Sequence, residues 1–571
     1  MARRGSAVRT HHRKKAGPAR TRVAKATTRA RPRREAPGFS TADHALSPPR
    51  IEFPRLYNAA VDLIEPNLAA GRGKRIAVID DRGSTTYAGL VRHVNRCGNA
   101  LKSLGLAVEQ RVMLILQDTV DFPSLFLGAI KLGAVPVPVN TLLTADDYAF
   151  MLRDSRARIL VVSSALFDKV KPALKNQPWL TSVVIAGGEV RGCKSLARLL
   201  ATASDRLDPA PTTCDDPAFW LYSSGSTGTP KGAVHVQSSL VTTAELYARP
   251  TLALAETDIV YSAAKLFFAY GLGNALTFPF RAGATAVLMA ERPTPQSVCR
   301  VLTQHRPTVF YGVPTLYAAL LASGELPGPG EHRLRACVSA GEALPEELGQ
   351  RWTKATGVDI YDGIGSTEML HIFLTNGPRA LRYGTTGKAV PGYQLKLVDD
   401  EGKPVKAGDV GELMVNGPSS AAFYWNNRAR SRSTFHGDWT RTGDKYVESE
   451  DGFFTYCGRT DDMLKVGGIY VSPFEVEAAL VTHPAVLEAA VIGVDDENRL
   501  VKPKAYIVLK SGYAAAGGLG EELKQHVRDR LAPYKYPRWI EFVAELPKTA
   551  TGKIQRFKLR QREAQRGEAA A

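Results

Sequence analysis

Short apolar segments alternate with amphipathic segments over the first part of the chain, and this alternation limits the fold more than any other feature. Strands are predicted at Ile76–Ile79, Val112–Leu116 and Leu160–Val162, and helices at Leu56–Leu68 and Leu125–Leu132. Short apolar strands separated by helices are typical of a mostly parallel sheet with helices on both faces. The sequence therefore predicts an α/β fold, with a large N-terminal domain built from such sheets.

The pattern changes in the C-terminal third. Alternating apolar and polar residues in Tyr383–Gly417 predict a small antiparallel β layer. After Gly458, a helix at Glu475–Leu480 and a strand at Ala489–Val494 predict a smaller α+β domain. At 571 residues the chain is too long for a single core, so this division is expected. We place a tail at residues 1–40, an N-terminal domain at 41–459 and a mobile C-terminal domain at 460–571.

The tail is strongly basic. The net charge is +18, and residues 1–34 contain 13 Arg and Lys but no acid, which leaves +5 for the rest of the chain. Because this segment has no apolar periodicity, we expect it to be disordered. Non-specific contact with nucleic acid or an anionic membrane, and an Arg-rich transit peptide, are alternatives.

The cysteines and the hydropathy indicate the compartment. Six scattered cysteines without a CxxC pair favour reduced thiols in the cytoplasm over a disulfide framework or a zinc site. No apolar run reaches about 18 residues, so no membrane span is predicted.

A stretch of small and hydroxylated residues, closed by Lys231, lies between two predicted strands, Phe219–Leu221 and Ala233–Val236. Its glycines let backbone N–H groups point at an anion, its hydroxyls add donors, and the lysine adds a point charge. A Walker A loop needs Ser or Thr directly after the lysine, where this chain has Gly232. The stretch predicts a different kind of polyphosphate-binding loop; a flexible linker is the alternative.

This loop resembles the phosphate-binding motif of the adenylate-forming superfamily, which includes acyl-CoA synthetases, luciferases and peptide-synthetase adenylation domains. Later segments are similar to the benzoate–CoA ligase family, and the resemblance extends from about Phe53 to Arg560. It implies an AMP-forming acid–thiol ligase that uses ATP, Mg²⁺ and coenzyme A. It also implies phosphate contacts by Ser223, Ser224, Gly225, Ser226, Thr227, Gly228 and Lys231.

A second motif runs from Asp362 to Glu368 and follows an apolar segment. By the resemblance, Thr367 contacts the α-phosphate, Glu368 holds Mg²⁺, and Asp362 accepts a hydrogen bond from the adenine amino group. Many relatives carry an aromatic residue that stacks on adenine at the position of Ile364. The isoleucine of this chain departs from that pattern and in this resembles the benzoate branch. A loop with a helix-capping hydroxyl is the alternative. Further nucleotide contacts implied by the resemblance are Gly341, Glu342, Ala343, Gly363, Ile364, Asp444 and Arg459.

The C-terminal motifs point to a moving domain. Leu546–Ile554 resembles the family segment whose last lysine, here Lys553, bridges the substrate carboxylate and the α-phosphate. Such a bridge is needed because two anions react and charge builds on the phosphate oxygens. By the same resemblance Asp461 is the hinge, and Gly467 and Gly468 line the tunnel for the pantetheine arm of CoA. The alternative for Lys553 is a surface lysine, and the alternative for Asp461 is a charged surface turn. For Gly467 and Gly468 it is the turn of a hairpin.

Lys265–Asn274 and Met369–Phe373 resemble the benzoate–CoA ligase family specifically. The resemblance implies a flat slot for an aromatic ring, lined by Phe268, Ala269, Tyr270, Gly363, Ile364 and His371. Judged without the resemblance, these residues would be ordinary core.

The predicted function is an ATP-dependent aryl–CoA ligase that forms an aroyl-AMP intermediate, with benzoate as first substrate and 4-hydroxy-, amino- or halobenzoate as runners-up. Loading of a carrier-protein thiol is the second hypothesis, and a nucleic-acid-tethered binding protein is the third. The partners of the predicted ligase would be the aromatic carboxylate, ATP and CoA, and we expect a cytoplasmic monomer or homodimer.

Overall fold

The structure is a computed structural model that describes residues 37–224, 230–460, 462–466, 469–496, 500–515, 517–532, 534–548 and 554–570. Gly38 and Ser40, inside the predicted tail, are hydrogen-bonded to Leu56 and Asp62. Within the described residues, no helix is long and apolar enough to cross a membrane.

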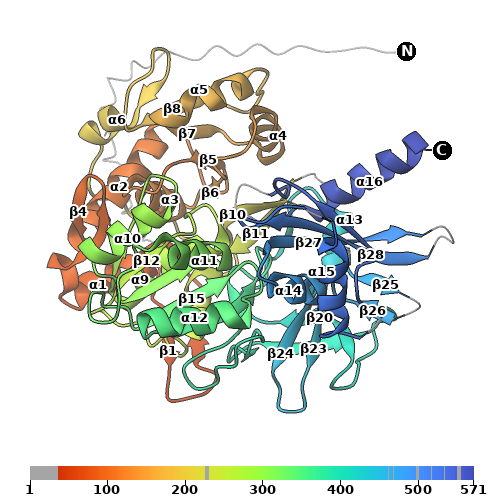
Figure 1. Cartoon of the computed structure of the whole chain (residues 1–571). Helices are drawn as coiled ribbons and strands as arrows, with labels where there is room; N and C mark the ends of the chain where they lie inside the picture. The colour runs from red at the N-terminus through yellow and green to blue at the C-terminus, as the bar shows by residue number, and fades with distance from the viewer. Residues whose placement is uncertain are drawn as a thin grey trace, which may run out of the picture. The chain divides into compact units, whose positions relative to one another are not determined.

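The largest sheet has nine strands in the order β18-β17-β16-β15-β14-β12-β13-β3-β4. Its strands β4, β12 and β15 are labelled in Figure 1. Its six central strands are parallel: β3 (Ile76–Asp80), β12 (Ile259–Ser262), β13 (Thr285–Val287), β14 (Val309–Gly312), β15 (Ala336–Ala340) and β16 (Ile360–Gly365). The antiparallel edges are β4 (Gly83–Thr86), β17 (Ile372–Thr375) and β18 (Lys388–Ala389). This arrangement confirms the predicted α/β class.

A second, five-stranded sheet is parallel throughout. Its strands, in sheet order, are β6 (Val135–Pro138), β5 (Arg111–Ile115), β7 (Ile159–Ser163), β8 (Ser182–Ala186) and β9 (Lys194–Ser195). Every residue of β7 is buried, as expected for a strand covered on both faces.

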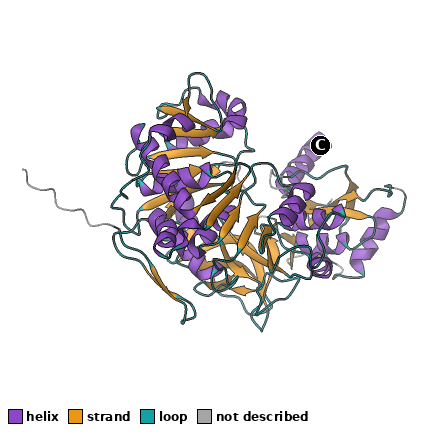
Figure 2. Ribbon diagram, turned by 90° about the vertical axis from the view of Figure 1, so that its left-hand side faces the viewer, coloured by secondary structure: helices purple, strands orange, loops and turns teal. Residues whose placement is uncertain are grey.

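Helices cover both faces of these sheets (Figure 2). On one face of the large sheet, α10 (Pro295–Gln304), α11 (Pro314–Ser323) and α12 (Glu346–Thr356) bury Tyr317 and Trp352 against Phe310. The core on the other face includes residues of α1 (Ala59–Ala69), α2 (Tyr87–Ser103), α3 (Asp121–Lys131) and α9 (Phe278–Ala282). Helix α1 begins later than predicted because the Asn58 side chain accepts from Val61 N–H and caps it.

The predicted phosphate-binding loop joins two antiparallel strands, β10 (Pro217–Ser224) and β11 (Pro230–Val236), with Ser223 opposite Lys231. Strand β11 also pairs with the short strand β21 (Phe423–Tyr424). Strands β10 and β11 therefore form a hairpin. Residues 225–229 lie outside the described residues.

The predicted antiparallel layer is confirmed and extends beyond Gly417. It contains β19 (Gln394–Val398), β20 (Val410–Asn416), β22 (Phe435–His436), β23 (Trp439–Glu448) and β24 (Phe454–Arg459).

The residues after Arg459 have hydrophobic cores of their own. Elements of this part are β25 (Leu464–Val466), β26 (Ile469–Val471), α14 (Pro473–Val481), β27 (Val486–Asp495), β28 (Val501–Leu509), α15 (Leu519–Arg528), β29 (Trp539–Phe542) and α16 (Arg556–Ala570). Val476, Leu480, Val491, Ile507 and Leu523 are buried together there. A separate core is what a separate domain requires, whereas the boundary at residues 459 and 460 stays a prediction.

Candidate active site

The loop between β16 and β17 brings Glu368 to the phosphate-binding hairpin. The Ser223 hydroxyl faces Glu368 Oε1 at 3.4 Å, and the Tyr424 hydroxyl donates to the same oxygen at 2.7 Å. The Lys231 ammonium lies 4.8 Å from the centre of the Tyr424 ring. Three residues predicted from two separate motifs therefore meet at one place: Ser223 and Lys231 from the first, and Glu368 from the second.

This place is rich in positive charge. Burial lowers the pKa of Lys231, the Glu368 carboxylate raises it, and the nearby cations Arg430 and Arg459 lower it further. Three cations near one carboxylate suit a polyphosphate that arrives with a divalent metal ion.

Glu368 also fits a magnesium ion by its chemistry. Carboxylate oxygens are the hard ligands that Mg²⁺ prefers, and Mg²⁺ is usually held by one or two carboxylates together with substrate phosphates. Within the described residues, no group of three or more His, Cys, Asp or Glu is close enough to hold a metal by itself. The donor set therefore matches a metal ion that would share its ligands with a nucleotide.

His235 on β11 fixes the backbone beside Glu368. Its Nε2–H donates to the Thr367 carbonyl at 2.8 Å, and its ring stacks on Phe219. Burial lowers the pKa of His235 to about 4, so the ring is neutral. On the other side, Ala421 N–H donates to the Glu368 carbonyl at 2.7 Å. His235 was not predicted as a site residue; its place among the apolar residues of the predicted strand Ala233–Val236 was the available signal.

Asp362 lies on strand β16 (Ile360–Gly365). The motif was predicted to begin after a strand at Val358–Ile360, and this is wrong because the strand extends into the motif. Leu344 N–H lies 3.4 Å from Oδ2, whereas Oδ1 is buried and has no hydrogen-bond partner in the described part of the chain. Burial raises the pKa of Asp362 to about 8. An unsatisfied buried acceptor fits a ligand with an amino group.

The predicted purine segment follows the neighbouring strand. Gly341, Glu342 and Ala343 come directly after β15, where Ala340 pairs with Gly363. Gly341 has φ +99°, a conformation that favours glycine. The segment and Asp362 are therefore brought together at the carboxyl ends of adjacent parallel strands, where ligands of such sheets bind.

Asp444 and Arg459 face each other across β23 and β24. The Arg459 Nη1 donates to Asp444 Oδ1 and to the Thr442 carbonyl, both at 3.0 Å. The Asp444 carboxylate, together with the ionisable neighbour Tyr456, raises the pKa of Arg459 against the effect of burial. Gly443 has φ +73°, and a Cβ there would lie 2.9 Å from Arg459 Nη2, so glycine makes room for this pair.

His371, which is predicted to line the aromatic slot, lies at the end of the loop that carries Glu368. His371 Nε2 donates to Asn274 Oδ1 at 3.0 Å. The ring centroids of Tyr247, Tyr270 and Phe278 lie 5.3, 5.6 and 4.4 Å from that of His371. Burial lowers the pKa of His371 to about 3, so the ring is neutral.

The other residues predicted for the slot lie on α8 and β16 or directly beside them. Phe268 precedes α8 (Ala269–Leu272), and Tyr270 donates from its hydroxyl to the Val338 carbonyl at 3.0 Å. Phe268, Ala269, Tyr270 and Ile364 are only partly buried and pack against the core. Gly363 lies on β16, where a Cβ would stand 3.0 Å from Ile372. Asn274 and Tyr247 were not predicted, because only tertiary contacts join them to His371.

Eight predicted residues lie outside the described residues: Gly225, Ser226, Thr227, Gly228, Asp461, Gly467, Gly468 and Lys553. Their assignments stay predictions, as does that of the Ser224 side chain.

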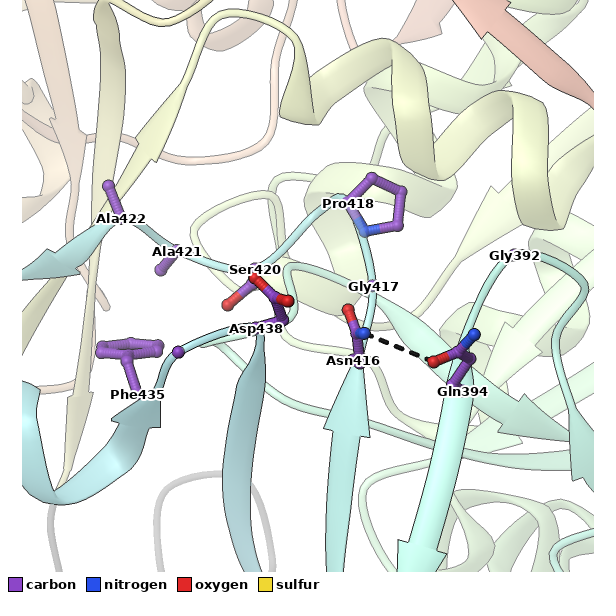
Figure 3. A pocket seen from close by; sticks show the side chains of 11 residues that line it. Gly392, Gln394, Asn416, Gly417, Pro418, Ser420, Ala421, Ala422, Phe435 and Asp438 are labelled. Carbon is purple, nitrogen blue, oxygen red and sulfur yellow. Dashed lines mark hydrogen bonds between the residues drawn. The ribbon is translucent and has the colours of Figure 1, made fainter.

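A surface pocket of about 530 Å³ is lined by none of the predicted site residues (Figure 3). Gln394, Asn416, Ser420, Phe435 and Asp438 contribute to its wall, and the Asn416 amide donates to Gln394. It contains no Lys or Arg, so it does not suit a polyphosphate. Ala421 connects it to the active site through the bond to the Glu368 carbonyl.

Comparison with known proteins identifies the family. The sequence profile described as AMP-binding enzyme matches residues 67–425, and the one described as AMP-binding enzyme C-terminal domain matches residues 475–553. A benzoate–CoA ligase from Thauera aromatica is 61% identical over 91% of this chain and 99% of the relative. A 4-hydroxybenzoate–CoA/benzoate–CoA ligase from Rhodopseudomonas palustris is 52% identical over 89% and 94%.

A solved structure supports the same conclusion. The benzoate CoA ligase from Burkholderia xenovorans LB400 superimposes with a TM-score of 0.83 at 53% identity, over 88% of this chain and all of that one. The chain belongs to the adenylate-forming superfamily of AMP-binding enzymes and, within it, to the benzoate–CoA ligase family.

Proposed function

We propose that this enzyme converts benzoate, ATP and CoA into benzoyl-CoA, AMP and diphosphate through benzoyl-AMP. As a member of its family, it is an AMP-forming acid–thiol ligase. The observation that carries the proposal is the loop between β16 and β17. It places Glu368 beside Lys231 and, a few residues later, His371 among aromatic rings. One loop thus joins a polyphosphate site to a slot for an aromatic acid.

In the proposed first half-reaction, the benzoate carboxylate attacks the α-phosphorus of ATP, and diphosphate leaves. Ser223 and Lys231 bind the β- and γ-phosphates, and Thr367 contacts the α-phosphate. Lys553 neutralises the two reacting anions. Asp362 Oδ1, which has no hydrogen-bond partner among the described residues, accepts from the adenine amino group.

Asp444 would hold the ribose. One carboxylate can accept from both ribose hydroxyls, and Arg459 keeps Asp444 in place through a 3.0 Å hydrogen bond. The charge of Arg459 also favours the ionised form of Asp444, which accepts hydrogen bonds best.

Glu368 would be the protein ligand of Mg²⁺. When bound, the metal ion supplies positive charge that screens the phosphate oxygens from one another. The chain orients Glu368 by the bonds from Tyr424, Ser223 and the Ala421 backbone.

In the proposed second half-reaction, the C-terminal domain (residues 460–571) turns about Asp461. The turn removes Lys553 and presents Gly467 and Gly468 to the pantetheine arm. The CoA thiolate then attacks the benzoyl carbonyl, a carbon–sulfur bond forms, and AMP leaves with the electrons of the broken carbon–oxygen bond. Because Lys553 and the arm need the same space, this movement separates the two half-reactions.

Benzoate is the proposed first substrate, and the name of the Thauera aromatica relative supports it. The Rhodopseudomonas palustris relative is named for 4-hydroxybenzoate as well. Tyr311, whose ring contacts Tyr270, has a buried hydroxyl without a partner in the described residues. A ring hydroxyl or amino group would find its hydrogen-bond partner there, so substituted benzoates are the runners-up.

A coupled assay of AMP release tests the proposal with benzoate, 4-hydroxybenzoate, 2-aminobenzoate and 4-chlorobenzoate. We expect benzoate to give the highest kcat/KM, with one CoA consumed for each AMP. AMP release without CoA consumption would favour the carrier-protein hypothesis, and absence of benzoate-dependent diphosphate release would contradict the proposal.

We also propose that the enzyme acts in the cytoplasm as a monomer or homodimer. All its cysteines are unpaired, which suits a reducing compartment. Size-exclusion chromatography with light scattering would distinguish the two oligomeric states.

A further inference from the structure

Tyr424 contacts both charged groups of the phosphate site, although it belongs to none of the motifs that predicted the site. Its side chain is almost fully buried, with 3% of the residue exposed. The hydroxyl donates to Glu368 Oε1 at 2.7 Å, and the ring face lies under the Lys231 ammonium at 4.8 Å. One side chain thus donates a hydrogen bond to the carboxylate from its hydroxyl and contacts the cation with the face of its ring.

The backbone holds Tyr424 in this place. Tyr424 pairs with Ala233 on β11, the strand that carries Lys231. Its N–H donates to the Ser431 hydroxyl at 3.0 Å, and Ser431 lies on α13 (Arg428–Thr434). The tyrosine is therefore attached to the phosphate-binding hairpin and does not depend on Glu368 for its position.

Tyr424 also separates two opposite charges. Lys231 and Glu368 form no ion pair with each other in the part of the chain that the structure describes, although each contacts the same tyrosine. A direct ion pair would have to break before a metal ion and a phosphate could bind to these groups. The ring provides the ammonium with a weaker, cation–π contact.

We propose that Tyr424 is a positioning residue that orients Glu368 for Mg²⁺ and keeps Lys231 free for phosphate. This inference rests on the proposed function. The hydroxyl occupies one lone pair of Oε1 and so fixes the rotation of the carboxylate. Mg²⁺ demands near-ideal octahedral geometry, and partners that orient a metal ligand change metal affinity by about 10- to 100-fold.

The test is the Mg²⁺ requirement of ATP binding, measured by isothermal titration without benzoate, so that no turnover occurs. Tyr424→Phe removes the hydroxyl and keeps the ring. We expect the Mg²⁺ concentration for half-maximal ATP binding to rise about 10-fold or more, while metal-free AMP binds within about twofold of wild type. A general loosening of the site would weaken AMP as well.

Tyr222→Phe is the matched control. Tyr222 lies on the same hairpin, and its hydroxyl also donates to a carboxylate, Asp154 Oδ2, at 2.6 Å. Asp154 is not among the residues proposed to bind the metal ion or the phosphates, so we expect an unchanged Mg²⁺ requirement in this variant.

Glu368→Gln provides a second measurement that does not depend on the folding of Tyr424→Phe. We expect it to raise the Mg²⁺ requirement at least as much as Tyr424→Phe, and Tyr424→Phe to add nothing further in the Glu368→Gln background. An unchanged Mg²⁺ requirement in Tyr424→Phe or in Glu368→Gln would overturn the inference. Equal losses of MgATP and AMP binding in Tyr424→Phe would overturn it as well. Failure of the wild type to form benzoyl-AMP would instead overturn the proposed function.

Discussion

Two buried side chains of the active site are held neutral by their surroundings. Burial raises the pKa of Asp362 to about 8 and lowers that of His371 to about 3. In the proposed acyl slot, the His371 ring would therefore offer a neutral surface to an aromatic substrate. An adenine amino group that donates to Asp362 would favour its ionised form, so nucleotide binding and deprotonation are linked.

Asp362 predicts a pH dependence of stability. Its pKa is raised from 3.8 to about 8 in the folded chain, so between these values the folded state binds the extra proton and stability falls as pH rises. We expect the Tm of nucleotide-free Asp362→Asn, relative to wild type, to increase from pH 5 to pH 8. Glu347→Gln, an exposed change on α12, should show no such trend. Parallel Tm curves for Asp362→Asn and wild type would contradict this account.

Gly273→Ala tests the wall behind His371. A Cβ at Gly273 would lie 2.3 Å from His371 Cδ2, which forces the ring to move. We expect a loss of about 1–3 kcal/mol in the free energy of unfolding and a higher KM for benzoate. In Gly520→Ala, the added Cβ meets open space on a helix, and we expect a gain of about 0.5–1 kcal/mol. Urea unfolding measures both; a stable Gly273→Ala enzyme with normal KM would refute the predicted clash.

The phosphate-binding hairpin is attached to the five-stranded sheet by aromatic side chains. Trp220 on β10 and Trp425, next to β21, have ring centroids 4.4 Å apart. The Arg111 guanidinium of β5 lies 5.6 and 5.2 Å from these rings, and Trp425 Nε1–H donates to the Asp154 carbonyl. These contacts therefore hold the hairpin that carries Ser223 and Lys231 against the five-stranded sheet.

Trp425→Ala should remove the contacts of the hairpin with Arg111 and Asp154 that Trp425 makes. We expect a loss of about 3 kcal/mol in unfolding free energy and a severalfold higher KM for ATP, because Tyr424 and Lys231 lose their support. Trp179→Ala, at a residue 46% exposed, should change stability by no more than about 0.5 kcal/mol. Steady-state kinetics with urea unfolding provides the check, and equal effects of the two variants would count against this view.

The elements that build the site were predictable where local pattern determines them. Apolar runs such as Val112–Leu116 and Leu160–Val162 are strands because they are buried on both faces. Tyr424, His235 and Asn274 were not predictable, because their contacts depend on pairing between segments far apart in the chain. Strand β21 has only two residues, and no periodicity can reveal so short a strand.

Most of the net positive charge of the whole chain lies in the N-terminal segment. Residues 1–34 hold 13 of the 74 basic residues and no acid. None of the residues proposed to bind ATP, benzoate or CoA lies there, so the segment has no part in the proposed chemistry.

Deletion of residues 1–34 should therefore leave turnover within about twofold of wild type, while binding to heparin or DNA weakens and loses most of its salt dependence. Benzoate kinetics and a salt titration on immobilised heparin measure the two effects. Loss of benzoyl-CoA formation on deletion would contradict this expectation.

The central claim is that Lys553, carried by the C-terminal domain, neutralises charge in the first half-reaction only. The direct measurement compares Lys553→Ala with wild type in two assays: benzoate-dependent exchange of diphosphate into ATP, and benzoyl-CoA formation from supplied benzoyl-AMP. We expect Lys553→Ala to lose about 10²–10³-fold or more in exchange, with thioester formation preserved. Exchange at the wild-type rate would contradict it.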